Sequence, residues 1–217
     1  MWREEKVEMR FSKVLILAPH TDDGELGCGA TIHKLLSQGT EVYYVAFSSC
    51  KDSLPAGWKE NSLILEMHEA TKTLGIKLEN VMVMDYAVRH FEEHRQSILD
   101  EMIRLDRKIE PDAVFSPSIH DIHQDHVTIA SECLRAFKKK TIFQYEVPWN
   151  NYTFDNQFFY RVDNKDVDAK VAAISCYKSQ YGRDYTSEKF IRSLLLTHGV
   201  QIGAEYAEVF EIPRLIV

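Results

Sequence analysis

The amino-acid sequence predicts a single-domain α/β fold of the Rossmann-like, doubly wound kind, with a mostly parallel sheet and helices on both faces. Short apolar runs alternate with longer amphipathic segments over most of the 217 residues. Polar clusters follow the ends of the apolar runs, as they do at the carboxyl edge of a parallel sheet. An apolar content of 45% is enough to bury one core, and nothing in the composition indicates a second domain.

The first strand and helix flank the densest polar cluster of the chain. The run Val-Leu-Ile-Leu at residues 14–17 is short and uninterrupted, which is typical of a parallel strand covered on both faces. Residues 26–38 carry apolar side chains at helical spacing and stop at Gly39, a suitable residue for a helix end. Residues 41–47, rich in Val and Tyr, predict a second strand.

The same alternation continues through the rest of the chain. Residues 58–74 place apolar side chains on one stripe before Gly75, and residues 80–84 predict a third strand. A long amphipathic helix is predicted over residues 91–109, because Pro111 ends it. The remaining strands are predicted at 112–116, 141–145, 158–162 and 206–212, and the remaining helices at 166–178, at 187–198 and in a segment that ends near residue 137.

We expect residues 1–217 to form one domain with three parts. Residues 1–12 are mixed and charged, which indicates a loosely held arm before the first strand. Residues 13–145 contain the alternating strands and helices of a Rossmann-like core. Residues 146–217 begin with an aromatic, loop-like stretch and are expected to supply cap elements over the site.

Charge and cysteine content restrict the partners and the compartment. A formal net charge of -7 without a Lys/Arg stripe argues against nucleic acid as a partner. No apolar stretch reaches the roughly 20 residues that span a bilayer, and residues 1–11 are too charged for a signal peptide, so we expect a cytoplasmic protein. The four cysteines lack any CxxC spacing and are expected to be reduced thiols. The sequence leaves a homo-oligomer open.

The first polar cluster is APHTDDGELGCG, residues 18–29, directly after the first predicted strand. His20, Asp22 and Asp23 offer one imidazole and two carboxylates, which suit zinc or a similar divalent ion. On an irregular turn, one carboxylate could bind the ion while the other stays free as a base. The same residues are also ordinary turn and helix-capping residues, so this stretch alone leaves both interpretations open.

The second cluster, SIHDIHQDH, follows the fourth predicted strand and holds His120, Asp121, His123, Asp125 and His126. If the fourth strand lies beside the first, the carboxyl ends of both strands meet at the topological switch point of the sheet. His20 and Asp23 would then face His123 and His126, and the two clusters would share one metal ion.

Three further residues are candidates for substrate contacts. Asp85 and Arg89 follow the third predicted strand at the same edge of the sheet. Trp149 lies in the aromatic loop and could form the wall of a pocket for a sugar or another polar ring. Solvated loop residues and a cover for the sheet edge are the alternatives.

These residues resemble the PIG-L/LmbE-like N-acetylglucosaminyl deacetylases. That family carries a PHPDDE-type motif after its first strand and an HxDH motif after a later one, matching residues 19–23 and 123–126 in order and context. The sequences Gly-Cys-Gly at 27–29, Ser-Gln at 179–180 and Tyr-Ala-Glu at 206–208 are also similar. The resemblance therefore spans nearly the whole chain.

The resemblance implies a zinc-dependent hydrolase, with iron(II) as an alternative metal, that removes an N-acetyl group from an amino sugar of the N-acetylglucosamine type. His20, Asp23 and His126 would bind the metal. Asp22 would be the general base and His123 would stabilise the oxyanion, while Asp125 would hold a histidine in place. The expected partner is a small-molecule amino sugar in a glycoconjugate or nucleotide sugar.

Two departures from the family pattern affect the choice of function. The chain has Thr21 and Gly24 where the common motif has Pro and Glu, and Glu25 follows one place later. Leu63 stands where many members carry an Arg, three residues before Glu66. A hydrolase of another small amide and a metal-free sugar-binding protein remain alternatives. A nucleotide-binding Rossmann protein is disfavoured because no GxGxxG motif is present.

Overall fold

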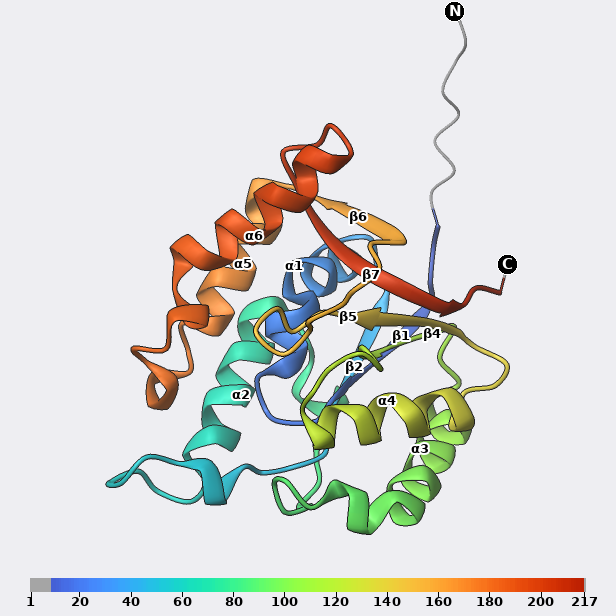
Figure 1. The fold of residues 1–217 in the computed structure, drawn as a ribbon, viewed down its shortest axis with the longest axis vertical. Coiled ribbons are helices and arrows are strands. Elements are labelled where there is room, and N and C mark those ends of the chain that lie inside the picture. The colour runs from blue at the N-terminus through green and yellow to red at the C-terminus, as the bar shows by residue number, and fades with distance from the viewer. Residues whose placement is uncertain (1–8, 217) are drawn as a thin grey trace, which may run out of the picture.

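Residues 9–216 are described by the computed structural model, in which seven strands form one sheet. The strands are β1 (Lys13–Ala18), β2 (Glu41–Ala46), β3 (Val81–Val83), β4 (Ala113–Pro117), β5 (Thr141–Tyr145), β6 (Phe158–Val162) and β7 (Tyr206–Arg214). Their order in the sheet is β3-β2-β1-β4-β5-β7-β6, as can be followed in Figure 1. The helices are α1 (Asp23–Ser37), α2 (Ser62–Leu74), α3 (Arg95–Ile109), α4 (Gln124–Ala136), α5 (Asn164–Ile174) and α6 (Glu188–Gln201).

The strands from β3 to β5 run parallel, and β7 pairs antiparallel with both β5 and β6. The predicted mostly parallel, doubly wound sheet is therefore confirmed. β1 lies between β2 and β4, so the chain winds in one direction from β1 to β3 and returns on the other side with β4. This reversal creates the switch point at the carboxyl ends of β1 and β4.

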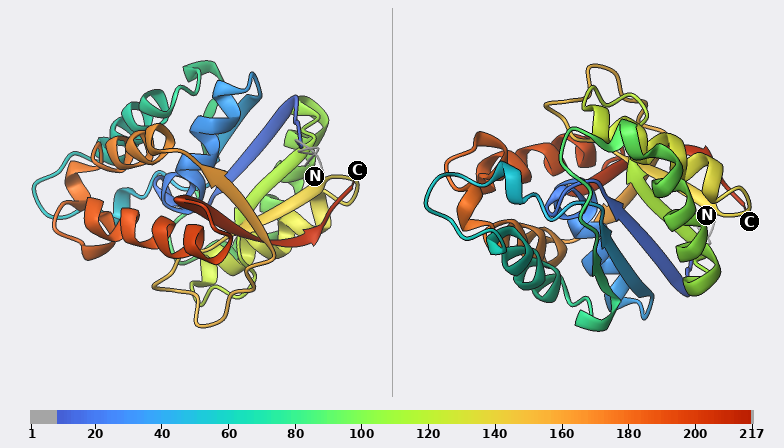
Figure 2. Two further views of the ribbon diagram at one scale, coloured as in Figure 1. Left: turned by 90° about the horizontal axis from the view of Figure 1, so that it is seen from above. Right: turned by 90° about the horizontal axis from the view of Figure 1, so that it is seen from below.

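Helices cover both faces of the sheet, which Figure 2 shows from two sides. Alternate side chains of β1 point to opposite faces because the side-chain period of a strand is two. Val14 and Ile16 pack with α1, α2 and the end of α5, whereas Leu15 and Leu17 pack with α3 and α4. Both faces of β1 are thus fully buried, which explains its uninterrupted apolar run.

Several helix boundaries differ from the prediction. α1 begins at Asp23 rather than at residue 26, because Leu26 N already donates to Asp22 O at 3.0 Å in the first helical turn. α2 begins at Ser62 rather than at residue 58, since the loop before it continues in tight turns. α5 ends at Ile174 rather than near residue 178, where short turns redirect the chain.

The C-terminal third contributes to the sheet as well as to its cover. β6 and β7 extend the sheet beyond β5, and β7 runs to Arg214, two residues past the predicted end. α6 packs against β7 and α5, in the upper left of Figure 1. Of the predicted arm, residues 9–12 contact the core, where Phe11 O accepts from Thr40 Oγ1 at 2.8 Å, and residues 1–8 lie outside the described part.

The helices in the described part of the chain include none that is both long and apolar enough to cross a membrane. All four cysteines are free thiols, and three of them are buried.

Candidate metal centre and active-site cavity

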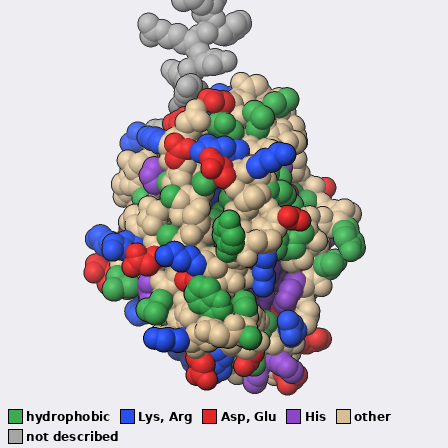
Figure 3. Space-filling view, turned by 90° about the vertical axis from the view of Figure 1, so that its left-hand side faces the viewer, with side chains coloured by type: hydrophobic (Ala, Val, Ile, Leu, Met, Phe, Trp, Pro, Cys, Tyr) green, Lys and Arg blue, Asp and Glu red, His purple; other side chains and the backbone are tan. Residues whose placement is uncertain are grey.

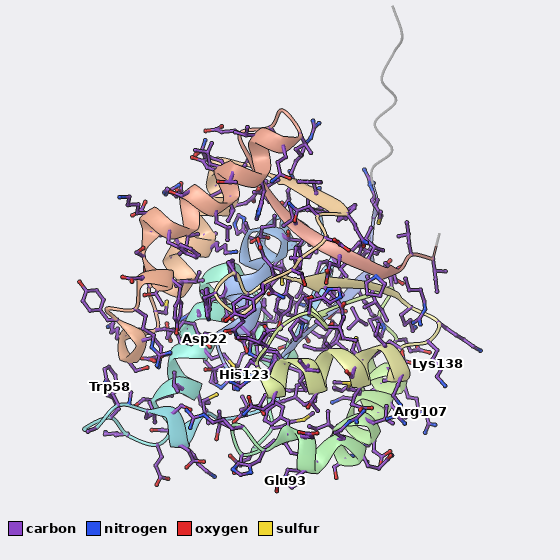
Figure 4. All side chains as sticks on the ribbon, in the orientation of Figure 1. Asp22, Trp58, Glu93, Arg107, His123 and Lys138 are labelled. Atoms are coloured by element: carbon purple, nitrogen blue, oxygen red, sulfur yellow. The ribbon has the colours of Figure 1, made fainter. Side chains whose placement is uncertain are left out.

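Two loops meet where the sheet reverses its winding. The first follows β1 and leads into α1, with His20 in the loop and Asp23 as the first residue of the helix. The second follows β4 and leads into α4, with His123 just before the helix and His126 in its first turn. Figure 4 shows Asp22 close to His123 near the middle of the molecule, whereas Trp58, Glu93, Arg107 and Lys138 lie at its edges. The predicted meeting of the two polar clusters is therefore seen in the fold.

Three donor atoms form a nearly equilateral triangle at this point. His20 Nδ1 lies 3.1 Å from Asp23 Oδ2, and His126 Nε2 lies 3.2 Å from the same oxygen. The two imidazole nitrogens are 3.2 Å apart. Ligand atoms about 2.1 Å from a tetrahedral zinc ion are about 3.4 Å from one another. The triangle is thus close to the size that such an ion requires.

The charges around the triangle favour a cation. Burial lowers the pKa of His20 and His126, but Asp23 and further carboxylates outweigh it and raise these pKa values to about 9 and about 10. Burial also raises the pKa of Asp23, yet the two imidazoles hold it well below its usual range. The cluster therefore attracts positive charge into a buried place, and two nitrogens with one oxygen suit a divalent zinc or iron(II) ion.

Two carboxylates hold the metal-facing imidazoles from behind. Asp125 Oδ2 lies 3.1 Å from His20 Nε2 and also accepts from the backbone N–H of Arg89 at 2.6 Å. Asp121 Oδ2 lies 2.7 Å from His126 Nδ1. Such contacts fix the orientation of a histidine and leave its other nitrogen free for a metal. Asp125 thus holds His20, which follows β1, and Asp121, which the sequence placed in the second cluster without a role, holds His126.

Asp22 lies beside the triangle but is not part of it. The Asp22 side chain lines the cavity, whereas the neighbouring Asp23 contacts both imidazoles of the triangle. Burial, together with the neighbouring Asp23 charge, raises the pKa of Asp22 to about 6. A carboxylate with this pKa can take up a proton near neutral pH, as a general base must.

His123 presents an imidazole N–H to the cavity. Its Nδ1 accepts from Asp125 N at 3.2 Å, so in the neutral ring the proton is on Nε2. Burial and the neighbouring charges of His126 and His20 lower the pKa of His123 to about 4, which keeps the ring neutral. One ligand atom from each of the three histidines lies within 4.8 Å of the others. His123 is therefore placed to donate a hydrogen bond beside the metal centre.

Beneath the first loop, Glu25 is fully buried between two tyrosines. The hydroxyls of Tyr44 and Tyr177 contact its two carboxylate oxygens, and they also lie 2.9 and 2.7 Å from the carbonyl oxygen of Thr21. A Cβ on residue 24 would lie 2.5 Å from the Tyr44 ring, so only glycine fits there. Gly24 therefore belongs to the buried support that Tyr44, Tyr177 and Glu25 form under the turn after β1.

The centre opens into a cavity of about 390 Å³. Arg89 and Trp149, both predicted to contact substrate, line it, and so do Arg183 and Tyr185, which the sequence reasoning did not single out. Trp149 stacks on Tyr185 with ring centroids 4.0 Å apart. The two rings form a flat aromatic wall of the cavity. Their pairing cannot be read from the sequence, because Trp149 and Tyr185 lie in separate segments of the chain.

Asp85 does not reach this cavity. It accepts from Ser49 Oγ at 2.6 Å and from Lys51 Nζ at 2.8 Å, beside a separate, shallow hollow. The placement of Asp85 among the substrate contacts is not supported by this geometry, because its carboxylate turns toward the loop after β2. Leu63, in contrast, is buried and lines the cavity as part of an apolar wall.

An α/β sheet with a His/His/Asp cluster at its switch point defines a class of proteins able to bind a divalent metal at the carboxyl edge of the sheet. Residues 15–137 match the family model described as "PIG-L: GlcNAc-PI de-N-acetylase". The chain belongs to this family, and the resemblance found in the sequence is confirmed.

Similar proteins agree with this assignment. The chain is 25% identical to diacetylchitobiose deacetylase of Thermococcus kodakarensis, over 90% of this chain and 81% of that protein. It is 26% identical to the uncharacterized deacetylase YaiS of Escherichia coli, over 76% and 90% of the two chains. The solved N,N'-diacetylchitobiose deacetylase of Pyrococcus horikoshii shares the fold, with a TM-score of 0.77, 24% identity, and coverage of 93% and 84%. Deacetylases are hydrolases that act on amides, so the predicted enzyme class is confirmed.

Proposed function

We propose that this protein is a zinc- or iron(II)-dependent hydrolase that removes the N-acetyl group from an amino sugar of the N-acetylglucosamine type. The observation that carries the proposal is the separation of roles between two adjacent carboxylates. Asp23 belongs to the triangle of donor atoms, whereas Asp22 lines the cavity beside it. The relatives named as diacetylchitobiose deacetylases support the amino-sugar part.

His20, Asp23 and His126 would hold the metal ion, with Asp125 and Asp121 fixing the two imidazoles. When bound, a divalent ion supplies Lewis acidity, which makes a water molecule more acidic and an amide carbonyl more electrophilic. Three protein ligands leave further coordination positions open, as in other catalytic sites.

Asp22 moves the proton in this proposal. As a water oxygen bonds to the carbonyl carbon of the acetamide, Asp22 takes up one of the water's protons. The carbon–nitrogen bond then breaks, and the same proton passes to the nitrogen of the leaving amine. The products are the free amino sugar and acetic acid, which keeps the second proton of the water and then loses it to solvent to become acetate, so atoms and charges balance.

His123 stabilises the charge that develops on the carbonyl oxygen. Its Nε2–H is the donor, because Nδ1 is occupied by the Asp125 backbone N–H. A neutral donor fixed in a partly buried site strengthens its bond as the oxygen becomes negative. This assignment refines the expected role of His123 by naming the donating atom and its protonation state.

The test is acetate release from N-acetylglucosamine and from diacetylchitobiose, measured with enzyme stripped by a chelator and then reloaded with zinc or iron(II). We expect release only from the reloaded enzyme, and the more active metal identifies the working ion. Release of a different acid from other amides would support the rival amide hydrolase. Saturable sugar binding without release under any metal condition would support the non-catalytic alternative and overturn the proposal.

A further inference from the structure

The pair Ser179 and Gln180 has no part in the proposed reaction, although Gln180 lines the cavity. The two residues end a short 3-10 turn, Lys178–Gln180, which follows α5 and contacts α2. Gln180 is 4% exposed, so its amide group is almost entirely withdrawn from bulk water. A buried amide needs partners both for its NH2 group and for its carbonyl oxygen. The partners of Gln180 therefore indicate what the cavity can bind.

Glu66 of α2 fixes the direction of the Ser179 hydroxyl. Its Oε1 accepts from the backbone N–H of Ser179 at 2.9 Å, and its Oε2 accepts from Ser179 Oγ at 2.5 Å. A serine hydroxyl carries a single proton, which it can donate to only one acceptor at a time. Because that proton points to Glu66, Ser179 Oγ can only accept a hydrogen bond from any other neighbour.

The other neighbour of Ser179 Oγ is the side-chain nitrogen of Gln180. This nitrogen, Nε2, lies 3.2 Å from the serine oxygen and donates to it. The opposite orientation of the amide would place two acceptor oxygens against each other, since the hydroxyl proton is already in use. Gln180 Oε1 accepts from no donor within residues 9–216. The wall of the cavity thus holds a nearly buried acceptor whose direction is fixed and which has no partner.

The turn that carries Gln180 is fastened to two other parts of the fold. The backbone N–H of Gln180 donates to Tyr177 O at 3.0 Å, and the Tyr177 hydroxyl lies 2.7 Å from the carbonyl oxygen of Thr21, next to Asp22. Ser179 is tied to α2 by the two bonds described above. Groups that are fixed before a ligand arrives lose little freedom when they bind it. The Gln180 acceptor is therefore held at a set position relative to the catalytic turn.

The partner that Oε1 lacks is a hydrogen-bond donor on the ligand. A neutral carbonyl oxygen accepts from a hydroxyl group without requiring any charge on the ligand. On the face shown in Figure 3, acidic, basic and hydrophobic side chains are mixed, so the surface there does not favour one sign of ligand charge. In the proposed reaction the acetamide nitrogen receives its proton from Asp22. The hydroxyl groups of the sugar are then the donors that remain for Gln180.

We propose that Gln180 accepts a hydrogen bond from one hydroxyl group of the amino-sugar substrate and thereby selects sugars that carry this hydroxyl. Ser179 and Glu66 are positioning residues, because they act through the orientation of the Gln180 amide. A ligand without the hydroxyl leaves the carbonyl oxygen unpaired at the wall of the cavity, which weakens binding. The identity of the ligand as a sugar rests on the proposed function, whereas the contact rests on the hydrogen bonds of Gln180.

The test measures binding rather than turnover, so that the two proposals can fail separately. Calorimetry is carried out on the metal-loaded Asp22→Asn variant with methyl N-acetylglucosaminide and with its 3-, 4- and 6-deoxy analogues. We expect one deoxy analogue to bind about tenfold more weakly than the parent glycoside, or weaker still. A deoxyfluoro analogue at the same position should bind no better, because fluorine cannot donate a hydrogen bond.

Substitution of Gln180 shows whether this residue reads the hydroxyl. Gln180→Met, in the Asp22→Asn background, keeps an unbranched side chain and should bind the parent glycoside about tenfold more weakly. Its affinity for the sensitive deoxy analogue and its metal content should be unchanged, because the contact is already absent there. Gln180→Leu is the second variant if Gln180→Met does not fold. Gln96→Met, at an exposed position of α3, is the matched control and should change nothing.

Substitution of Ser179 tests the positioning role. Ser179→Ala removes the partner of Gln180 Nε2, so the amide can turn, and the parent glycoside should lose part of its advantage over the sensitive deoxy analogue. Ser179→Thr keeps the hydroxyl and should restore that advantage. A loss that is equal for every ligand in Ser179→Ala would indicate a general disturbance of the fold and would contradict the positioning role.

Equal affinity for all four glycosides would overturn the inference, and so would the absence of binding by any of them. A deoxyfluoro analogue that binds as tightly as the parent, or a Gln180→Met variant that discriminates as before, would also overturn it. If the glycosides bind through Gln180 but the wild-type enzyme releases no acetate from the parent, the hydroxyl contact stands and the proposed function falls. If acetate is released and the Gln180 variants behave like their background, the proposed function stands and the inference falls.

Discussion

Two buried carboxylates are in contact with α1 but have different partners: Asp23 is the first residue of the helix, and Glu208 lies on β7. Glu208 is 2% exposed, accepts from Lys170 Nζ at 2.6 Å, and accepts from two backbone N–H groups of α1 at 3.2 and 2.6 Å. Asp23 is 5% exposed and instead meets His20 and His126 at the wall of a cavity. The first carboxylate has a permanent cation within the protein, and the second has only imidazoles whose pKa values it raises.

The sequence of α1 explains why Glu208 is paired within the protein and why Asp23 faces the cavity. Cys28 has a non-helical backbone, with φ −143° and ψ 26°, which divides the helix and frees the N–H groups of Ala30 and Thr31 for Glu208. The first half of the helix carries Asp23 at its own N-terminus, where a negative charge is favourable. A closed ion pair therefore indicates a structural role, while an incomplete one that opens to a cavity indicates a ligand site.

The largest effect should come from removing a member of the triangle. We predict that His126→Ala loses the bound metal and that acetate release falls to background, because two remaining donors bind a divalent ion weakly. His33→Ala is the matched control: His33 also lies on a carboxylate, Asp166 at 2.7 Å, but outside the cavity, and should keep metal and activity. A fully metallated His126→Ala protein would contradict the assignment of the triangle.

The second effect separates the base from the ligand. Asp22→Asn should keep its metal and lose about 10²- to 10⁴-fold in the rate of acetate release, which is the usual contribution of general base catalysis. Asp85→Asn, outside the cavity, is the matched control and should keep both the bound metal and the rate of acetate release. Metal content and single-turnover rates of the two variants check this, and an active Asp22→Asn enzyme would remove Asp22 as the base.

The third prediction concerns the closed pair. Glu208→Ala leaves the Lys170 cation buried without its partner, which should cost about 3–5 kcal/mol of unfolding free energy. The folded fraction should still bind metal in full. Urea denaturation measures the stability, and the double variant Lys170→Met with Glu208→Leu should recover part of it. A Glu208→Ala protein of unchanged stability would mean that the pair adds nothing to the fold.

A smaller effect is expected from the carboxylate behind His126. Asp121→Asn should weaken metal binding about 10- to 100-fold, as changes to such supporting residues do. Competition with a chelator of known affinity gives the number. If affinity is unaltered, the 2.7 Å contact between Asp121 and His126 does not help to orient the ligand.

The smallest effect is on the pH profile. A base acts only when unprotonated, so activity should fall as pH drops through the pKa of Asp22. That pKa is raised to about 6 by burial and by Asp23, and a bound cation nearby would bring it lower. We expect an acid limb in kcat with an apparent pKa at or below about 6. The residual activity of Asp22→Asn should lack this limb, and its persistence there would assign the limb to another group.

Much of the fold could be predicted from the sequence, because each strand and helix up to β5 carries its own periodicity. The bounds predicted for β5 and β6 match those observed. The antiparallel placement of β7 between β5 and β6 was not predicted, since no local pattern states which strand a C-terminal strand will join. The start of α2 was also misplaced, because the apolar spacing continues back into a loop.

The site divides in the same way. The residues that meet there could be located from the sequence, because His20, Asp22, Asp23, His123 and His126 lie in two short clusters next to strand ends. The histidine that Asp125 contacts could not be predicted from the sequence. Whether it is His123 or His20 depends on how the two loops pack against each other. Loop packing also explains why the Asp85 side chain points away from the cavity, whereas Arg183 and Tyr185 line it.

The measurement that tests the central claim most directly is the metal content of the purified, tag-free protein, determined by elemental mass spectrometry before chelation, after chelation, and after zinc or iron(II) is added back. The account predicts about one ion per chain, lost to the chelator and regained on addition. A protein that binds no metal under any of these conditions would contradict the metal centre and, with it, the proposed hydrolysis.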